Sequence, residues 1–347
     1  MILIVNAGSS SLKLALFDGL TQVAQARADV TADYAAALEQ GLQAMGNPAF
    51  AAAAHRVVHG GVGLVDACRI TAEVEGQIAA LVPLAPLHNP PALAGIAALR
   101  AVQPDLPQYA SFDTAFHATN PAVALRYAIP QSLHDAGMRR YGFHGLSYAS
   151  LVGTLRDRGD LPQRLLACHL GNGASLCAVL DGQSVATTMG YSPLDGLTMG
   201  TRAGSIDGNA VLALASQLGI AGACSLLNRQ SGLQALGGSS DMRDTGPAAV
   251  EHFIYWAVRH AGSMVAAMGG LDAVAFTGGI GENDAGVRAG IVAGLAYLGA
   301  VMDDQANAVD ARVLQDATSH VAIWTVPAME ERHIAAEALQ LMAAEGR

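Results

Sequence analysis

The sequence predicts an α/β protein built from two related lobes, and an internal repeat together with three glycine-rich turns supports this fold class. Leu3–Gly19 (LIVNAGSSSLKLALFDG) and Leu166–Gly182 (LACHLGNGASLCAVLDG) align without a gap at an offset of 163 residues, from 3 to 166. Each reads as an apolar strand, a glycine-rich polar turn, a second strand and Asp-Gly. A third glycine-rich turn is Gly278–Asn283. A repeat at this distance indicates a duplicated domain rather than a solenoid, whose period is about 20–50 residues. We expect the turns of the two lobes to face one another across a ligand cleft.

Apolar runs separated by turn residues predict five strands, and one helical pattern lies among them. The strands are expected at Ile2–Val5, Leu12–Phe17, Val23–Val30, Ala53–Val58 and Ala273–Thr277, and the helix at Asp33–Met45. The uncharged segment Gly208–Asn228 contains asparagine, serine, glutamine and glycine. This favours a buried pair of short helices over a membrane span, which needs about 20 strongly apolar residues.

Composition excludes several classes of protein. The chain has 347 residues, of which 52% are hydrophobic and 14% charged, which excludes a disordered chain. Its formal net charge of −10 disfavours a nucleic-acid partner. The four cysteines form no metal-binding pair, so we expect buried thiols in a reducing compartment. No basic segment precedes the apolar run at the N-terminus, and we expect a cytoplasmic protein without a membrane partner.

The glycine turns are suited to phosphate, because consecutive backbone N–H groups in such turns form a concavity that binds anions. Ser9, Ser11 and the single lysine, Lys13, add side-chain donors to the first turn, and Asn172-Gly173 repeats the pattern in the second. An ordinary hairpin loop is the alternative for each turn taken alone. The P-loop and dinucleotide-binding signatures are absent from the sequence, as are the serine-hydrolase and zinc-protease signatures.

Charged and polar side chains also stand at expected strand ends beside glycines. Arg56 precedes His59-Gly60-Gly61, Asp113 follows an apolar run, His144 lies in YGFHG, and Arg202 lies in MGTRAGSID. Taken singly, each has an ordinary structural interpretation as a surface ion pair or a buried hydrogen bond. Together they stand where functional loops usually lie.

Nine strings in order along nearly the whole chain resemble the acetokinase family, which shares the fold of actin, Hsp70 and sugar kinases. They are NAGSSSLK (6–13), HRVVHGG (55–61), APLHNPP (85–91), FDTAFH (112–117), YGFHG (141–145), CHLGNGAS (168–175), MGTR-x-GSID (199–207), SDMRD (240–244) and FTGGIGEN (276–283). The resemblance implies duplicated ribonuclease-H-like, actin-like ATPase lobes with an active-site cleft between them. The expected N-terminal lobe is 1–118, completed by a C-terminal helix at 331–347, and the expected nucleotide-side lobe is 119–330.

The same resemblance implies roles for individual residues. The implied catalytic residues are Arg56, Asp113, His144, His169 and Arg202. The acid substrate would contact Arg56, Val58, Leu87, Pro193 and Arg202, and the metal would be held by Asn6 and Glu330. The implied ATP-binding residues are Ser9, Ser11, Lys13, His169, Asn172, Gly173, Asp241, Met242, Arg243, Gly279, Ile280, Gly281 and Asn283.

The implied activity is reversible transfer of the γ-phosphate of ATP to acetate, giving acetyl phosphate and ADP, with Mg²⁺ or alternatively Mn²⁺, in a homodimer. The alternatives are the same chemistry on propionate or butyrate, a catalytically silent nucleotide-binding module, and a sugar kinase. The chain departs from the family pattern in three places and is shorter between Gly19 and His55. P-T-[ND]-E-E is Pro327–Glu331 (PAMEE), G-T-S-H is Gly145–Tyr148 (GLSY), and I-D-P is Ile206–Gly208 (IDG).

Overall fold

The computed structural model describes residues 1–31 and 33–346, and the chain divides into two compact units. Unit 1 comprises residues 1–118 and 329–347, and unit 2 comprises residues 119–328. Arg347, the last residue of the helix expected at 331–347, lies outside the described residues.

Unit 1 is built on a six-stranded sheet in the order β3-β2-β1-β4-β6-β5. The strands β1, β2 and β3 are antiparallel neighbours, β1, β4 and β6 run parallel, and β5 is antiparallel to β6. The bounds are β1 (Ile2–Ala7), β2 (Ser11–Asp18), β3 (Thr21–Asp29), β4 (Ala52–Val57), β5 (Cys68–Arg69) and β6 (Gln108–Phe112). The strands predicted within this unit are therefore confirmed to within two residues at each end.

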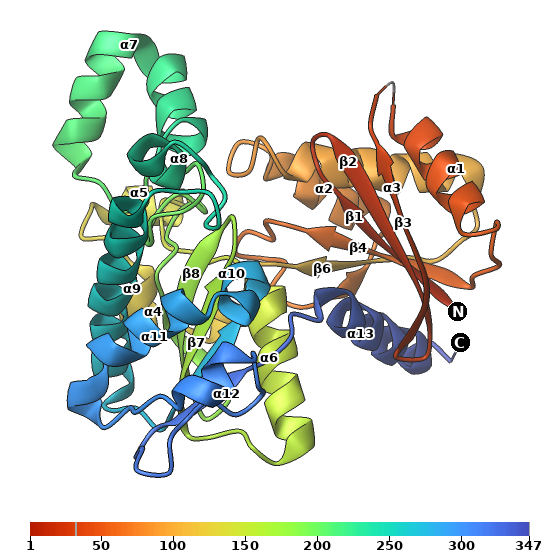
Figure 1. Ribbon diagram of the computed structural model, residues 1–347. Helices are drawn as coiled ribbons and strands as arrows, with labels where there is room; N and C mark the ends of the chain where they lie inside the picture. Colours follow the sequence, from red (N-terminus) through yellow and green to blue (C-terminus); the bar gives the residue numbers. More distant parts are fainter. Residues whose placement is uncertain (32, 347) are drawn as a thin grey trace. The chain divides into compact units, whose positions relative to one another are not determined.

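Helices cover this sheet because its inner strands alternate apolar side chains toward both faces. In Figure 1, α1 and α3 lie on one side of the sheet and α13 on the other. Leu3 and Val5 of β1 pack in one core with Leu38 of α1 and Leu99 of α3. The helices are α1 (Tyr34–Ala44), α2 (Ala72–Ala80), α3 (Asn89–Val102), the short 3₁₀ helix η1 (Ala115–Thr119) and α13 (Glu330–Ala344). The predicted helix at 33–45 is confirmed, and the Asp33 side chain caps it by accepting the backbone N–H of Ala36 at 2.8 Å.

Unit 2 contains a five-stranded sheet in the order β11-β10-β7-β8-β9. Here β7, β8 and β9 are antiparallel neighbours, and β7, β10 and β11 run parallel. The bounds are β7 (Arg164–Leu170), β8 (Ala174–Leu180), β9 (Gln183–Thr187), β10 (Ala273–Thr277) and β11 (Ala322–Thr325). Read in the opposite direction, from β9 through β8, β7 and β10 to β11, this sheet matches the order β3-β2-β1-β4-β6 of unit 1. The match confirms that the repeat is a duplicated sheet.

The pairing corrects one detail of the repeat. Ala7 pairs with Leu12 across the first turn, but Leu170 pairs with Ala174 across the second. The turn of unit 2 is thus one residue shorter, and the offset falls from 163 to 162 after it. The gapless alignment was wrong there, because the residues on either side of a turn are matched by hydrogen-bond register rather than by letter identity.

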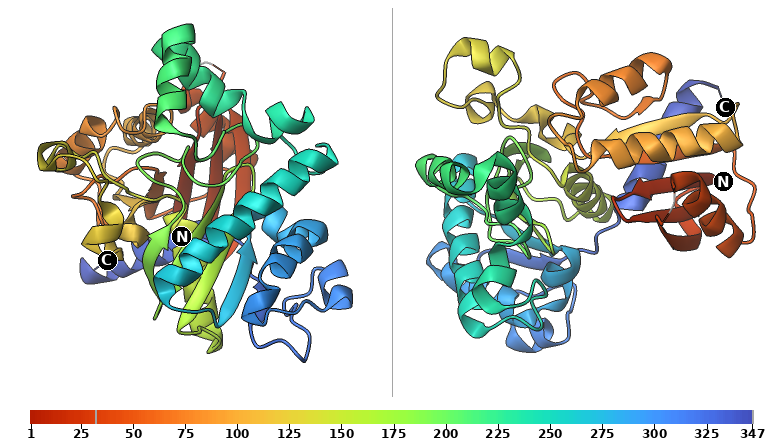
Figure 2. Two further views of the ribbon diagram at one scale, coloured as in Figure 1. Left: turned by 90° about the vertical axis from the view of Figure 1, so that its left-hand side faces the viewer. Right: turned by 90° about the horizontal axis from the view of Figure 1, so that it is seen from above.

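The helices of unit 2 pack around its sheet. Long α9 runs across β7, β8 and β9, and α6 packs against β7 (Figures 1 and 2). The helical elements are α4 (Ala122–Leu125), α5 (Gln131–Asp135), α6 (Gly145–Arg158), α7 (Gly208–Arg229), α8 (Gly232–Gly237), α9 (Pro247–Met268), α10 (Gly278–Asn283), α11 (Ala285–Gly294), the 3₁₀ helix η2 (Ala296–Leu298) and α12 (Asp304–Ala308).

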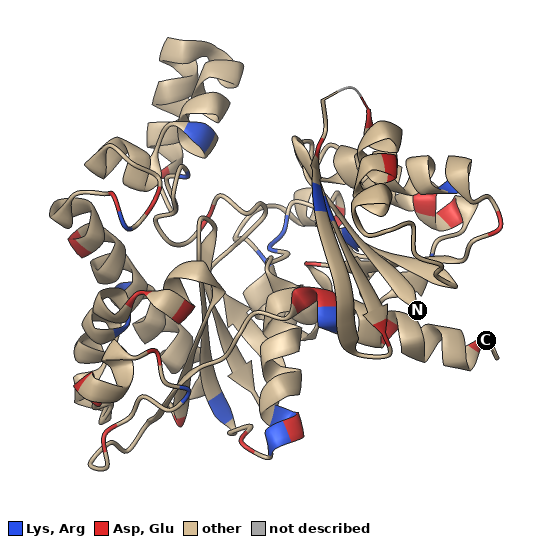
Figure 3. Ribbon diagram, turned by 45° about the vertical axis from the view of Figure 1, so that its right-hand side comes forward, with Lys and Arg blue, Asp and Glu red and all other residues tan. Residues whose placement is uncertain are grey.

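Helix α7 confirms one part of its prediction and corrects another. Gly219 has φ 72°, ψ 165° and divides it into the expected pair of short helices. The pair is not buried, however: Leu212, Leu218 and Ile220 are 68%, 50% and 84% exposed, and α7 is almost entirely free of charge in Figure 3. Among the described residues α7 is the one helix whose length and apolar character would suit a membrane span. Its first half, residues 208–218, is only about 16 Å long at 1.5 Å per residue, against about 30 Å of hydrocarbon core.

Candidate active site

In unit 1, the parallel strands β1, β4 and β6 end beside one another and carry polar residues at their ends. Asn6 lies at the end of β1, Arg56 near the end of β4, and Asp113 directly after β6. Asp113 donates its backbone N–H to the carbonyl of Val57 at 3.0 Å, which continues the pairing of β4 with β6. The sheet therefore places Arg56 and Asp113 side by side although 57 residues separate them.

Arg56 is the centre of a charged cluster. Its Nη2 and Nε atoms donate to the two carboxylate oxygens of Asp113, at 2.6 and 3.2 Å. Its Nη1 atom lies 3.5 Å from the amide oxygen of Asn6. Its Nε atom lies 3.7 Å from a carboxylate oxygen of Glu330, in the first turn of α13. Three residues that the sequence analysis singled out thus converge on the guanidinium of Arg56.

Burial and the two carboxylates set the pKa values in this cluster. Burial lowers the pKa of Arg56, but Asp113 and then Glu330 outweigh it, so the net pKa is raised and the guanidinium stays charged. Burial raises the pKa of Asp113, Arg56 opposes this, and the Glu330 carboxylate raises it further, to about 6. Asp113 is only 2% exposed. Its negative charge is therefore costly without a further cation nearby.

This donor set fits a magnesium ion. Carboxylate and amide oxygens are the ligands that Mg²⁺ prefers, and the ion needs only one or two protein carboxylates because it keeps several waters. Asp113, Glu330 and Asn6 provide such oxygens around Arg56. Within residues 1–31 and 33–346, no group of three or more His, Cys, Asp or Glu side chains could hold a metal ion on its own.

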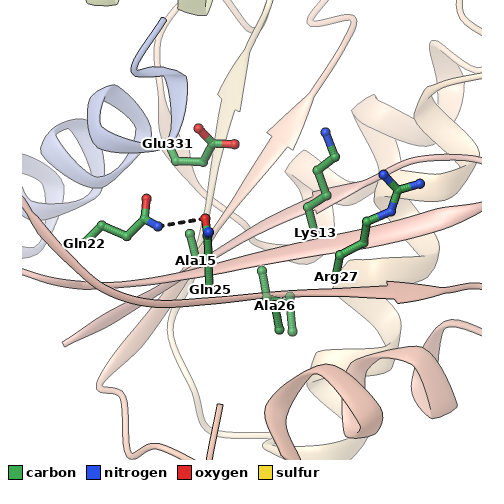
Figure 4. A pocket seen from close by; sticks show the side chains of 8 residues that line it. Lys13, Ala15, Gln22, Gln25, Ala26, Arg27 and Glu331 are labelled. Atoms are coloured by element: carbon green, nitrogen blue, oxygen red, sulfur yellow. Dashed lines mark hydrogen bonds between the residues drawn. The ribbon is translucent and has the colours of Figure 1, made fainter. Parts of the chain in front are cut away.

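Two cationic side chains lie on the β2–β3 hairpin that follows the first glycine turn. Lys13 on β2 pairs in register with Arg27 on β3, and both line a cavity of about 400 Å³ with Glu331 of α13. Figure 4 shows the Lys13 and Arg27 side chains lying next to each other and pointing the same way. Ser9 is exposed and Ser11 half-buried in the turn itself. The sequence analysis missed Arg27. Only the register between β2 and β3, which pairs Arg27 with Lys13, could have indicated it.

The residues expected to contact the acid's apolar part lie in different places. Val58 is half-buried directly after β4, whereas Leu87 of unit 1 is 42% exposed, in the segment before α3. Pro193 belongs to unit 2, and its carbonyl accepts a hydrogen bond from Arg202 Nη1 at 2.6 Å.

In unit 2, a cavity of about 610 Å³ brings together three segments that are far apart in the sequence. The turn after β7, the segment before α9 and the short helix α10 line it. Most of the residues implied for nucleotide binding lie on its wall; the lining residues are Gly171, Asn172, Ser240, Asp241, Met242, Arg243, Gly279, Ile280, Asn283 and Asp284. A Cβ atom built on Gly279 would meet nothing within 4 Å, so this side of α10 is open to a ligand.

Glu282, which the sequence analysis passed over inside GIGEN, holds α10 in place. One of its carboxylate oxygens accepts the backbone N–H groups of Gly278, at 2.9 Å, and of Ala328, at 3.0 Å. A carboxylate at the N-terminus of a helix stabilises its free N–H groups. The spacing of Gly278 and Glu282 could have indicated this contact, but the bond to Ala328 depends on the fold.

Two histidines are stacked beside the turn after β7. The rings of His144 and His169 lie 4.1 Å apart with an angle of 29° between their planes. Nδ1 of His169 is 2.8 Å from the Ser147 hydroxyl, and Nδ1 of His144 is 2.8 Å from the Ser175 hydroxyl. His144 has φ 59°, a left-handed conformation that non-glycine residues rarely adopt and that occurs often at functional sites. The sequence analysis assigned no role to either serine.

Arg202 differs from Arg56 in having no ion-pair partner among the described residues. It is half-buried, and burial lowers its pKa. Its Nη2 atom and Nε2 of His144 both approach Gly173: a Cβ built on that glycine would lie 2.6 and 3.0 Å from them. A guanidinium and an imidazole therefore point at one place beside a glycine turn, and within residues 1–31 and 33–346 no carboxylate pairs with the guanidinium. This arrangement suits an anion.

Known proteins resemble this chain over nearly its whole length. The model of the acetokinase family matches residues 23–336. The chain belongs to the acetokinase family. It is 39% identical to an acetate kinase of Methylocella silvestris over an alignment of 394 positions that covers 98% of each chain. It is also 40% identical to an acetate kinase of Leifsonia xyli over 99% of each chain. Because the alignment with the first relative is longer than the 347 residues present here, this chain is the shorter of the two.

Solved structures of the family have the same fold. An acetate kinase of Porphyromonas gingivalis is 30% identical with a TM-score of 0.90, covering 98% of this chain and 99% of that one. A propionate kinase of Francisella tularensis is 35% identical with a TM-score of 0.91, covering 97% and 98%. The family and the duplicated α/β fold predicted from the sequence are confirmed.

Proposed function

We propose that this member of the acetokinase family is an acetate kinase, which transfers the γ-phosphate of ATP to a carboxylate oxygen of acetate and gives acetyl phosphate and ADP, reversibly. The observation that carries the proposal is the approach of Arg202 Nη2 and His144 Nε2 to one place at the Gly173 turn. It lies in the unit whose cavity is lined by the expected nucleotide-binding residues. Phosphoryl transfer spreads negative charge over the equatorial oxygens, so catalysis consists mainly of positioning and cationic stabilisation.

The nucleotide is assigned to unit 2. The cavity of about 610 Å³ has room for adenosine against Ile280 and the open side of Gly279, with Asp241, Met242 and Arg243 opposite. The N–H groups of Gly171 and Gly278 are bonded within the chain, so we assign the phosphate oxygens to the other backbone N–H groups of the turn after β7 and of the first turn of α10. His169, near the end of β7, is the side chain of this strand that we assign to the transferring phosphoryl group.

Arg56 of unit 1 and Arg202 of unit 2 are the arginines we assign to the two anions of the reaction, the acid and the phosphate. Acetate is already ionised at pH 7, because an ordinary carboxyl group has a pKa of about 4, so no general base is needed. The two-point contact of Asp113 with Arg56 supports an orienting role for this carboxylate instead. Arginine suits both anions because its planar fork can bind carboxylate and phosphate through two parallel hydrogen bonds.

Asn6, Glu330 and Asp113 are the residues we assign to the magnesium ion. When bound, the ion would neutralise part of the negative charge on the phosphate groups. In this family pattern the residues before Glu330 are polar, whereas here they are Ala328 and Met329. Arg56 nevertheless lies near the Glu330 carboxylate, as described above, and holds it toward the other two oxygens.

Propionate or butyrate is the second candidate substrate, and a specific observation favours keeping it. The propionate kinase of Francisella tularensis matches this chain as well in structure as the acetate kinases do. Half-buried Val58 supports a small pocket. One methylene group changes selectivity by only about 1–3 kcal/mol, so the acid must be determined by experiment.

Hydroxylamine trapping of the acyl phosphate tests the proposal directly. The protein is incubated with ATP, Mg²⁺ and acetate, propionate or butyrate in parallel, with EDTA as the control. A strong acetate signal that EDTA abolishes supports acetate kinase activity and the metal requirement. A stronger signal with a longer acid changes the substrate within the same reaction, and no signal with any acid, while ATP still binds, identifies a silent nucleotide-binding module.

We also propose a cytoplasmic homodimer. All four cysteines are free in the structure, which agrees with a reducing compartment. The exposed apolar surface of α7 supports association with a second copy, because large exposed apolar patches mark interaction sites. Light scattering coupled to size exclusion should give a mass of about 71 kDa, twice the 35.4 kDa of one chain. A mass near 35 kDa at micromolar concentration would contradict the dimer.

A further inference from the structure

Tyr148 stands where the family pattern G-T-S-H has histidine, and its side chain takes part in a chain of hydrogen bonds behind the two stacked rings. It lies in the first turn of α6 and is fully buried, at 0% exposure. Its hydroxyl is 2.5 Å from the Ser175 hydroxyl, which is 2.8 Å from Nδ1 of His144. Ser175 is likewise fully buried, on β8.

The protons of this chain can be placed in order. Burial raises the pKa of Tyr148 well above its ordinary value, so the phenol keeps its proton, while the backbone of His169 also hydrogen-bonds to its oxygen. A backbone N–H can only donate, so the phenol's own proton is left for Ser175. Ser175 accepts it and has one proton of its own, which goes to Nδ1 of His144. A neutral imidazole that accepts at Nδ1 carries its proton on Nε2.

Nε2 of His144 is the ring atom that faces the proposed reaction site. It lies on the side of Gly173 approached by Nη2 of Arg202. The neighbouring ring, that of His169, has a different hydroxyl beside its Nδ1 atom, the hydroxyl of Ser147. With the proton on Nε2, both Arg202 and His144 are donors to one oxygen; with the proton on Nδ1, His144 would present a lone pair to an anion.

We propose that Tyr148 is a positioning residue that acts through Ser175 to hold His144 as the Nε2–H tautomer, so that His144 and Arg202 donate together to a phosphoryl oxygen. The catalytic part of this inference rests on the proposed kinase function, whereas the tautomer does not.

The tautomer can be measured without any substrate. Long-range ¹H–¹⁵N correlation spectra of protein labelled with ¹⁵N-histidine distinguish the two neutral tautomers, and His144→Gln identifies the His144 signals. We expect the Nε2–H pattern in the wild type. We expect a mixture of both tautomers in Tyr148→Phe, which removes one oxygen and keeps the ring, and in Ser175→Ala.

Activity supplies the second readout. We expect Tyr148→Phe to lower kcat about tenfold and to leave the KM for ATP and for acetate within about twofold. The double variant Tyr148→Phe/Ser175→Ala should lower kcat no more than Ser175→Ala alone, because both remove links of one chain. The matched control is Tyr141→Phe, since the Tyr141 hydroxyl donates to the Gly137 carbonyl at 2.8 Å instead; it should keep wild-type kcat and tautomer.

The outcomes separate the two proposals. An Nδ1–H signal for His144 in the wild type, or an unchanged tautomer in both Tyr148→Phe and Ser175→Ala, overturns the relay whatever the activity. The expected tautomers in a protein that phosphorylates no acid support the relay and refute the kinase assignment. If Tyr148→Phe proves unfolded by circular dichroism, Ser175→Ala decides the question alone.

Discussion

Replacement of Arg202 by glutamine should remove activity without removing stability, and the structure gives the reason. Within the described residues, the Arg202 side chain makes one hydrogen bond, to the Pro193 carbonyl at 2.6 Å. No ion pair is lost in Arg202→Gln, and a single hydrogen bond contributes about 1 kcal/mol net. We therefore expect the free energy of unfolding to change by less than about 1 kcal/mol.

The cost in catalysis should be much larger. Arg202 is a half-buried, unneutralised donor aimed at the Gly173 turn. Loss of one donor to a developing charge in such a site costs about 3–4 kcal/mol of barrier. At about 1.4 kcal/mol for each factor of ten, kcat should fall about 140- to 720-fold. Hydroxylamine trapping with acetate measures the rate, and urea denaturation measures the stability.

Two comparisons make the result decisive. Arg158→Gln changes an exposed arginine at the end of α6 and should keep kcat within about twofold. Arg56→Gln should lower both activity and stability, the latter by about 2–3 kcal/mol, because it leaves buried Asp113 without its cation. Near-wild-type turnover of Arg202→Gln, or a loss of stability equal to that of Arg56→Gln, would refute the separation of roles argued here.

Three further predictions concern the nucleotide, the acid and the charged cluster. Gly279→Leu should raise the KM for ATP at least tenfold without affecting the free energy of unfolding, because its side chain enters the open cavity; Gly286→Leu is the control, and equal KM values for the two would contradict the assignment. Val58→Ala should move the ratio of kcat/KM for acetate over propionate toward propionate by up to about tenfold, and an unchanged ratio would remove Val58 from the acid pocket. Because the pKa of Asp113 is raised from 3.8 to about 6, the folded state holds this proton more tightly than the unfolded state, so this group lowers stability as pH rises through that window. Asp113→Asn should therefore lose less stability than the wild type between pH 4 and pH 6 in urea titrations, and parallel pH profiles would show that Asp113 titrates normally.

The sequence by itself predicted the local elements and the identity of the motifs. Apolar runs separated by turn residues indicated β1, β2 and β10. Such patterns can be recognised in the sequence because they depend on residues near one another in the chain. The glycine turns after β1 and β7 could be recognised for the same reason, since a left-handed or closely approached backbone selects glycine locally. The duplicated sheet followed from two such patterns in the same order.

The tertiary structure decided everything that depends on pairing across the chain. The register after the second turn shifted by one residue, since hydrogen bonding to β7, and not letter identity, sets it. The exposure of α7 could not be predicted from its sequence. Its apolar composition does not show whether the helix packs inside its own unit or lies on the surface. The contact of Arg56 with Asp113 joins strands that are neighbours only in the folded sheet. Likewise, the sequence gives no sign that Tyr148 and Ser175 interact. Their hydrogen bond depends on the distance between the two side chains, which is set only when α6 packs against the sheet.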